Sequence, residues 1–506
     1  MAVTVHTGTL FGVDSMPVEV EVDLVRRLPG MVIVGLPGGA VRESTDRVRS
    51  ALSQSGNEFP RKRVVVNLAP ADLRKTGTGF DLPIAVGILA ASGQVPSTLL
   101  PDTAFAAEVS LAGRLRRSKG ALPLALMARA QGFQRLVLSQ GDAAEAAVVP
   151  GIDVLGATDL ASVVSWMRGE GQLRPPSPRC RSTGGSAPDL QEVRGQARAR
   201  RALEVAAAGG HNLLLVGSPG CGKTMLAARM PGILPSLCFD EAVDVTRVYS
   251  AAGLLPAGNG LLCQRPFRAP HHSITAAGMV GTATLQPGEV SLAHHGVLFL
   301  DEVAEFRRSV LELLRGPLED RSVRLVRAAG SAVLPANVSL VAAANPCPCG
   351  YAGHPTRACT CSPAQVDRYR ARLSGPLMDR IDLQVWVQPV GSQVLVSGHP
   401  GEPSCSVRER VEEARDRQRS RAAVTGAASN ATLRGDAIRA AARPTEGAEQ
   451  ALQRALDTYG LSARAWARIL KVARTIADLD RTERVEVAHV LEATAYRLPE
   501  GQDGRS

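Results

Sequence analysis

The sequence predicts an α/β protein made of three parts: an N-terminal α/β domain, a central α/β domain built on a parallel sheet, and a helical C-terminal domain. Short β-branched runs alternate with Ala/Leu-rich helical stretches over the first part of the chain, and the same alternation returns in the central part. The remainder is helical and rich in Ala and Arg. At 506 residues the chain is long enough for several domains, each with its own apolar core.

Two segments without apolar periodicity separate these parts. Residues 169–188 are dense in Pro, Gly, Ser and Arg, which predicts an exposed linker, and residues 391–425 are expected to form a second connection. We therefore place the N-terminal domain at 1–168, the central domain at 189–390 and the C-terminal helical domain at 426–500.

Composition narrows the classes of protein to consider. The 58 Lys and Arg residues exceed the 48 Asp and Glu residues, and the net charge of +10 is spread along the chain, so polyanion binding is permitted. Aromatic residues make up only 3%, which argues against stacking platforms and leaves phosphate contacts as the basis of any nucleic-acid binding. Because the N-terminus resembles no export signal and no apolar run approaches ~18 residues, we expect a cytoplasmic protein without a membrane segment.

A phosphate-binding loop is predicted where an apolar strand, LLLV (213–216), runs into GSPGCGKT and then into a helix-forming segment. Glycines let backbone N–H groups curl around a triphosphate, Lys223 reaches its β- and γ-phosphates, and the Thr224 hydroxyl ligates Mg²⁺. The alternative is a glycine turn with a chance lysine. The residues expected to bind ATP are Gly217, Ser218, Pro219, Gly220, Cys221, Gly222, Lys223 and Thr224.

Two later strands supply polar groups at their ends. The strand in GVLFLDE ends in Asp301 and Glu302, which predicts a carboxylate for Mg²⁺ and a second one that polarises the attacking water. These acids could instead cap the next helix. The strand in VSLVAAANP ends in Asn345, an amide suited to positioning that water, although Asn before Pro is also an ordinary turn.

A cysteine cluster follows, in the pattern C-P-C-x9-C-T-C. Four thiolates in one loop favour a structural Zn²⁺ site over a catalytic one, because all four positions would be protein ligands. Reduced free thiols or a redox pair remain the alternative, since C-x-C is less common at zinc than C-x2-C. The cysteines are Cys347, Cys349, Cys359 and Cys361.

A family resemblance emerges from several motifs together: GSPGCGKT, GVLFLDE, AAANPCPCG and LSGPLMDRIDL. With RPFRAPHHSITAAGMVG (265–281) and ARAWARILKVARTIADL (463–479), they resemble the Mg-chelatase-like AAA+ ATPases, and most closely their ComM/YifB subfamily. The resemblance covers nearly the whole chain.

The resemblance implies a homo-oligomeric ring, expected to be a hexamer, in which each ATP lies between two subunits. The matching position for the arginine that reaches the neighbour's γ-phosphate is Arg380, which could instead pair with Asp379 or Asp382. For the arginine that senses nucleotide from the C-terminal domain, Arg464 matches best and Arg468 is the reserve.

DNA contacts are also implied. The segment 321–340 alternates apolar and basic residues as a hairpin presenting Arg324 and Arg327 would, and in related ATPases such a hairpin enters the pore. The subfamily's insertion carries further candidates for contact with the DNA backbone, and the alternative is that they hold the insertion in place. These candidates are Arg265, Arg268, His271 and His272.

The N-terminal domain resembles the Lon protease domain, through KTGTGFDLPIAVGILAASG (75–93) and residues 109–133. A Lon-type protease needs a serine nucleophile beside a lysine base. Gly79 and Arg116 occupy the matching positions, so we expect a scaffold or substrate-engaging domain without peptidase activity.

The leading functional hypothesis is an ATP-hydrolysing ring motor that translocates on single-stranded or branched DNA and drives branch migration of recombination intermediates. The alternative is a chelatase-type motor that remodels a protein partner. ATP and Mg²⁺ are the expected cofactors, with Zn²⁺ as a structural ion.

Overall fold

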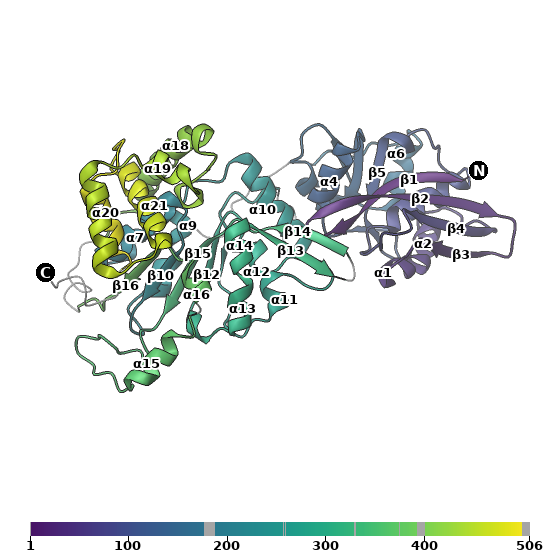
Figure 1. Cartoon of the computed structure of the whole chain (residues 1–506). Coiled ribbons are helices and arrows are strands. Elements are labelled where there is room, and N and C mark those ends of the chain that lie inside the picture. The colour runs from purple at the N-terminus through teal and green to yellow at the C-terminus, as the bar shows by residue number, and fades with distance from the viewer. Residues whose placement is uncertain are drawn as a thin grey trace.

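The computed structural model describes residues 2–176, 188–256, 258, 260–327, 330–373, 375–391 and 400–497. Three bodies follow one another along the chain, with the N-terminal domain at one end, the C-terminal helices at the other and the central domain between them (Figure 1). The α/β class and the helical C-terminal region are confirmed. None of the described helices is both long and apolar enough to cross a bilayer.

The N-terminal domain is a seven-stranded mixed sheet with helices on both faces. Its order is β3-β4-β2-β1-β5-β8-β9. Successive side chains of a strand point to opposite faces, so Val5 packs on α3 (Asp81–Ala91) while Gly8 faces α4 (Ala121–Ala130). The strands are β1 (Val3–Phe11), β2 (Asp14–Val25), β3 (Gly30–Val34), β4 (Arg63–Ala69), β5 (Thr103–Ala106), β8 (Arg135–Ser139) and β9 (Asp153–Ala157).

The first predicted linker is shorter than expected at its start. Leu173 is buried and Arg174 bridges to Gly156 of β9, so residues up to 174 belong to the N-terminal domain. Positions 177–187 lie outside the described residues.

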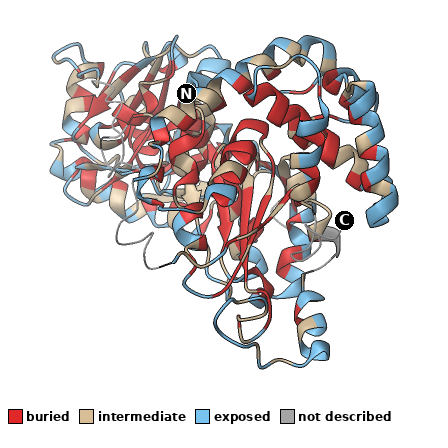
Figure 2. Cartoon of the chain, turned by 90° about the vertical axis from the view of Figure 1, so that its left-hand side faces the viewer, coloured by how far each residue is buried: buried red, intermediate tan, exposed pale blue. Residues whose placement is uncertain are grey.

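The central domain is a five-stranded sheet in which all neighbouring strands are parallel, in the order β11-β12-β15-β10-β16. The three inner strands β12, β15 and β10 are near-continuous apolar runs because helices cover the sheet, and most of their residues are buried (Figure 2). The strands of the sheet are β10 (Leu213–Val216), β11 (Phe267–Arg268), β12 (Val297–Leu300), β15 (Ser339–Ala344) and β16 (Leu383–Trp386).

A two-stranded antiparallel hairpin, β13 (Ser322–Arg327) and β14 (Gly330–Pro335), precedes β15. Its residues alternate between buried and exposed, as expected for a hairpin with one covered face. Positions 328 and 329, inside the predicted AAGSA turn, lie outside the described residues.

The C-terminal helices pack on α7 (Ala197–Gly209) and close one side of the central domain. The segment 391–425, predicted as a connection, contains a long helix. Residues 404–425 form the helix α18 (Ser404–Thr425), because Val407, Val411 and Ala414 recur on one side and are buried. Positions 392–399 and those after 497 lie outside the described residues. The remaining helices are α19 (Asp436–Ala442), α20 (Glu446–Tyr459), α21 (Ala463–Leu479) and α22 (Val487–Ala495).

The N-terminal and central domains contact each other through the β1–β2 turn and through helix α4. The β1–β2 turn meets the hairpin, where a Cβ at Gly12 would lie 3.1 Å from Leu334 Cδ2 and one at Gly330 would lie 2.7 Å from Phe11 Cζ. Helix α4 packs on α10 (Phe239–Ala252), and Gly120 N–H donates to Ser250 O at 3.2 Å.

Candidate nucleotide-binding site

The predicted phosphate loop lies at the carboxyl end of β10 and leads into α8 (Lys223–Ala227). Gly220 and Gly222 have φ of +78° and +94°, which only glycine adopts without strain. A Cβ at Gly217 would lie 2.5 Å from Val387 O, so the loop needs glycine there for space. The sequence therefore folds this segment into a tight backbone curl that opens at a helix N-terminus.

Lys223 lies inside this curl and is only 8% exposed. Its Nζ donates to Gly217 O at 2.6 Å, to Ser218 O at 3.0 Å and to Asn345 Oδ1 at 3.2 Å. The ammonium group is thus fixed where the loop and the end of β15 meet, which brings together two residues predicted independently from separate motifs.

The predicted metal ligands also meet. Thr224 Oγ1 donates to Asp301 Oδ2 at 2.7 Å across 77 residues of sequence. Asp301 follows β12, and parallel strands bring their carboxyl ends to one edge of the sheet. A hydroxyl and a carboxylate at this edge form a hard oxygen pair of the kind that Mg²⁺ prefers.

Glu302 is exposed and has a left-handed backbone, with φ of +48°. Such a conformation is costly for a residue with a side chain and recurs at functional sites. It turns the chain away from the strand directly after Asp301, whose Oδ1 accepts the Glu302 N–H at 2.9 Å. The carboxylate therefore remains accessible at the same edge of the sheet as the phosphate loop.

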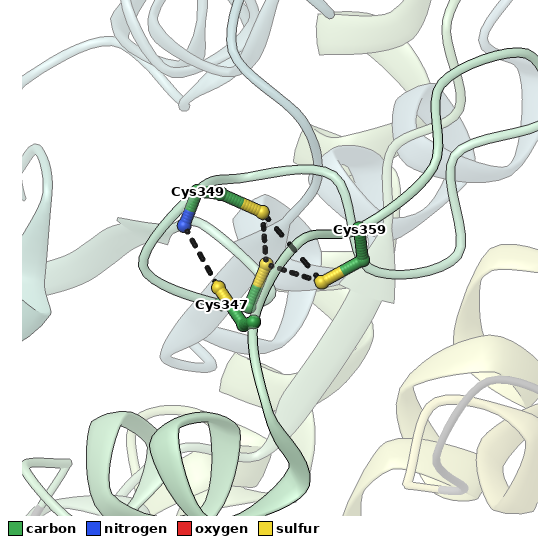
Figure 3. A group of neighbouring side chains, drawn as sticks. Cys347, Cys349 and Cys359 are labelled. Atoms are coloured by element: carbon green, nitrogen blue, oxygen red, sulfur yellow. Dashed lines mark hydrogen bonds between the residues drawn. The ribbon is translucent and has the colours of Figure 1, made fainter.

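The four cysteines of the predicted metal site converge, and their sulfur atoms all lie within 4.8 Å of one another. Figure 3 shows the thiols of Cys347, Cys349 and Cys359 turned toward one another. Cys347 Sγ is 3.3 Å from Cys349 Sγ and 3.6 Å from Cys359 Sγ, while Cys361 Sγ accepts the Cys349 N–H at 3.4 Å. Tetrahedral coordination at about 2.3 Å spaces sulfurs by about 3.8 Å, whereas a disulfide brings them to about 2.0 Å. The group fits a single tetrahedral ion.

Backbone N–H groups of Tyr351 and Thr360 lower the pKa of the Cys349 thiol to about 5. A further N–H, from Ala352, donates to Cys347 Sγ at 3.3 Å. Such donors stabilise the thiolate of Cys349, the form of cysteine that binds metals. The pKa values of Cys359 and Cys361 are raised instead, because the neighbouring sulfurs disfavour further negative charge.

The cysteine loop touches the phosphate loop. A Cβ at Gly350 would lie 2.6 Å from Pro219 Cδ, so glycine is required for the two loops to approach. Cys347 also follows Asn345 by only two residues. The shape of the cysteine loop is therefore coupled to both sides of the predicted ATP site.

The predicted arginines lie at the opposite edge of the sheet, where the amino ends of the strands meet. Arg380 precedes β16, whose Leu383 is paired with Leu213, whereas the phosphate loop follows Val216. Four residues of strand separate the two edges by roughly 13 Å. Arg380 therefore does not lie at its own subunit's phosphate loop.

Arg464 and Arg468 lie beside Arg380 and line the same hollow, of about 960 Å³. Arg464 Nη1 is 3.0 Å and Arg468 Nη2 is 3.5 Å from Asp379 carboxylate oxygens. The Arg464 side chain is 77% exposed and that of Arg468 is 12% exposed, so Arg464 is the freer to move.

Arg380 contacts Glu319, on α14 (Arg315–Asp320). Sequence analysis did not single out Glu319, because nothing in a short helix 61 residues earlier in the chain indicates this contact. Of the two predicted alternative partners of Arg380, Asp379 binds Arg464 and Arg468, and Asp382 binds His211.

Two of the candidate DNA contacts are engaged within the fold. Arg265 donates to Pro235 O, to His295 O at 2.7 Å and to Glu241 at 2.9 Å. Arg268 forms a bidentate pair with Glu289 at 2.6 and 2.7 Å. The geometry favours the alternative that these two arginines hold the insertion in place.

The other four candidates are more accessible. His271 is exposed and its ring lies 4.0 Å from that of His272. Arg324 and Arg327 are both exposed, Arg324 on the outer face of the hairpin and Arg327 at the end of β13, in the register of the inner face. The inner face packs on the β1–β2 turn, a contact that the sequence did not indicate.

The two residues that match the Lon catalytic pair, Gly79 and Arg116, have different surroundings. Arg116 is exposed and 3.8 Å from Glu108. A Cβ at Gly79 would lie 3.7 Å from Ser118 Oγ, and both residues line a hollow of about 310 Å³ together with Lys119. Ser118 was not predicted; Lys119 packs its methylenes on Gly253 of the central domain.

Comparison with known proteins agrees with this architecture. The family models described as subunit ChlI of Mg-chelatase, magnesium chelatase subunit ChlI, and magnesium chelatase subunit ChlI C-terminal match residues 20–142, 189–395 and 401–497.

Similar proteins match along almost their whole length. The chain is 42% identical to protein YifB of Escherichia coli, covering 97% of this chain and 96% of YifB. It is 43% identical to competence protein ComM of Haemophilus influenzae, covering 97% of both. An uncharacterised protein of Mycobacterium tuberculosis is 43% identical, with 96% of both covered.

A parallel sheet with a phosphate loop, a carboxylate strand and an asparagine strand at one edge defines a P-loop ATPase of the AAA+ type. The chain belongs to the magnesium-chelatase-like AAA+ ATPases and, within them, to the ComM/YifB subfamily.

Proposed function

We propose that this ATPase is a homo-oligomeric ring motor, a hexamer, that translocates on DNA and drives branch migration of recombination intermediates in the cytoplasm. One observation supports the proposal of a ring. Arg380, Arg464 and Arg468 gather at the edge of the sheet opposite the phosphate loop. A complete ATP site then requires the arginines of one subunit and the phosphate loop of the next.

Each residue has a role in this mechanism. Lys223 and the backbone N–H groups of the loop bind the β- and γ-phosphates, while Glu302 polarises the attacking water and Asn345 positions it. Arg380 of the neighbouring subunit stabilises the charge that develops on the γ-phosphate. Hydrolysis at one interface thereby changes the contact between two subunits.

The residues present fit the two metal ions. The hydrogen-bonded Thr224 hydroxyl and Asp301 carboxylate would hold Mg²⁺, which supplies neutralisation of phosphate charge. The cysteine cluster would hold Zn²⁺ as a structural ion, supported by the spacing of the four sulfurs.

DNA as the substrate is supported by three features. The net charge is +10, Arg324 and Arg327 are exposed on a hairpin, and the similar ComM of Haemophilus influenzae is named a competence protein. Phosphate contacts would dominate binding, so the DNA effect should weaken as salt rises.

The test is steady-state ATP hydrolysis with and without single-stranded, duplex and four-way-junction DNA. Glu302→Gln serves as the control for contaminating ATPase. We expect DNA to stimulate hydrolysis and the stimulation to vanish in the Glu302→Gln protein, with junction DNA then converted in a branch-migration assay.

The DNA proposal would be contradicted by hydrolysis that depends on Glu302 but is not stimulated by any of these DNAs. This comparison is made at low salt and with the ring assembled. Such a result would favour a chelatase-type motor acting on a protein partner.

A further inference from the structure

Helix α14 ends at an arginine in a costly conformation. Arg321 has φ of +54°, at the helix C-cap where its N–H donates to Pro317 O at 2.9 Å. Glycine is usual in this left-handed region, and a residue with a side chain costs about 1–2 kcal/mol there. An arginine at this position points to a use for its side chain.

The side chain lies among other cations. Burial and the nearby Arg434 lower the pKa of the Arg321 guanidinium, and Arg321 in turn contributes to lowering the pKa of Arg415 and Lys471. No carboxylate within 4.0 Å of Arg321 is found in the described part of the chain. A half-buried cation in such surroundings attracts an anion.

Neighbouring cations already have partners. Arg415 donates to Ala207 O at 2.9 Å, Arg434 to Glu319 O at 3.1 Å and Lys471 to Ala431 O at 3.0 Å. Arg321 is also half-buried, but in the described part of the chain its guanidinium makes no hydrogen bond or ion pair of this kind.

Arg321 lines the hollow that also holds Arg380, Arg464 and Arg468. It further lines an adjoining hollow of about 310 Å³ with Arg415. Arg321 therefore lies in the same hollow as the arginines that, in the proposed ring, contact the ATP of the neighbouring subunit.

We propose that Arg321 binds the phosphate oxygens of the ATP held by the neighbouring subunit, as a further cation supplied in trans. The inference rests on the proposed ring. Triphosphate oxygens match an unpaired guanidinium in charge and in geometry. Arg380 would stabilise the γ-phosphate, and Arg321 would neutralise phosphate charge beside it.

The first test uses Arg321→Gly, because glycine removes the side chain and relieves the backbone. We expect an unfolding temperature no lower than that of the unchanged protein, an assembled ring, and DNA-free ATP hydrolysis reduced about tenfold to a hundredfold. Arg321→Lys should recover part of the activity because it keeps the charge.

Arg443→Gly is the matched control. Arg443 is also a C-cap arginine with positive φ, of +44°, but it is exposed on α19 and does not line the hollow. Its replacement should leave hydrolysis unchanged. Full activity of Arg321→Gly, or loss of DNA stimulation with normal DNA-free hydrolysis, would overturn the proposal, the second result pointing to a DNA phosphate instead.

Mixed rings separate the two proposals. Rings of Arg321→Gly alone should have strongly reduced hydrolysis and rings of Lys223→Ala alone none, but mixing the two proteins pairs an intact phosphate loop with an intact Arg321 at some interfaces. We expect activity above that of either protein. Arg380→Ala mixed with Lys223→Ala tests the ring itself in the same way.

Restoration with Arg380→Ala but not with Arg321→Gly would place Arg321 in its own subunit's function and overturn the inference while keeping the ring. Restoration with neither would overturn the ring and the inference together.

Discussion

At the scale of single residues, the sharpest prediction concerns the hydrogen bond between Thr224 and Asp301, which follow two different strands. Thr224→Val keeps the size of the side chain but removes the donor that binds Asp301. We expect binding of Mg·ATP to weaken at least about tenfold, because the ion loses a ligand. Binding of ATP in the presence of a chelator should change little.

Thr224→Ser is the matched control and should bind Mg·ATP normally, as measured by titration calorimetry. Thr224 is exposed, so unfolding of both variants should match that of the unchanged protein within about 0.5 kcal/mol. Equal Mg·ATP affinity of the Val and Ser variants would contradict the assignment of this hydroxyl to the metal.

The residues of the site differ in how far the sequence could reveal them. Lys223, Asp301 and Asn345 each follow an apolar strand, and parallel strands align such ends, so their meeting was predictable. Glu319 and Arg321 come from a short helix whose position is set by tertiary packing, and no spacing pattern indicates their approach to Arg380.

Among the elements, the cysteine loop carries the clearest test. Cys359→Ala should abolish binding of one zinc ion per chain, measured by atomic spectroscopy, because three thiolates no longer close a structural site. ATP affinity should also fall several-fold, about threefold to tenfold, since this loop touches Pro219 and follows Asn345.

Cys405→Ser provides the control, as Cys405 is exposed on α18, away from the cluster. A protein purified without zinc and indifferent to Cys359→Ala would leave the thiols as free cysteines and contradict the metal assignment.

Helices and strands could be predicted from the sequence where the local pattern of apolar and polar residues determines them. The hairpin strands, residues 322–327 and 330–335, alternate between buried and exposed residues over most of their length. In α18, by contrast, the apolar residues are so thinly spaced among charged ones that the segment resembled a connection. Its burial depends on α7, which lies about 200 residues earlier in the chain. Distant partners of this kind are invisible to local periodicity.

At the scale of the whole molecule, buried ionisable groups lie where the N-terminal and central domains meet. Arg117 binds Asp142 at 2.9 Å and donates across the interface to Leu255 O at 3.2 Å. Beside it, Glu145 is 3% exposed and accepts the Leu122 N–H at 3.0 Å. This interface was not predictable, since each domain's pattern describes only its own core.

Burial raises the pKa of Glu145 to about 7 from 4.5. Between these values the folded protein holds a proton that the unfolded chain releases, so this group's contribution to stability is fully present below pH 4.5. It is lost at about 1.4 kcal/mol per unit as pH rises to 7. His294 acts oppositely: burial lowers its pKa to about 3, and stability is lost as pH falls from 6.5.

Comparison with a variant isolates Glu145 from these other groups. Glu145→Gln is neutral at every pH and can still accept the Leu122 N–H, so it should exceed the unchanged protein by less than about 1 kcal/mol at pH 5 and by about 1–3 kcal/mol more at pH 8. The measurement is the difference in unfolding free energy from urea titrations at both pH values, with the exposed Glu170→Gln as control. Because His294 is the same in both proteins, its opposite slope cancels. A difference that is equal at pH 5 and pH 8 would mean that Glu145 is ionised in the folded interface and that its burial does not make the stability of the protein pH-dependent.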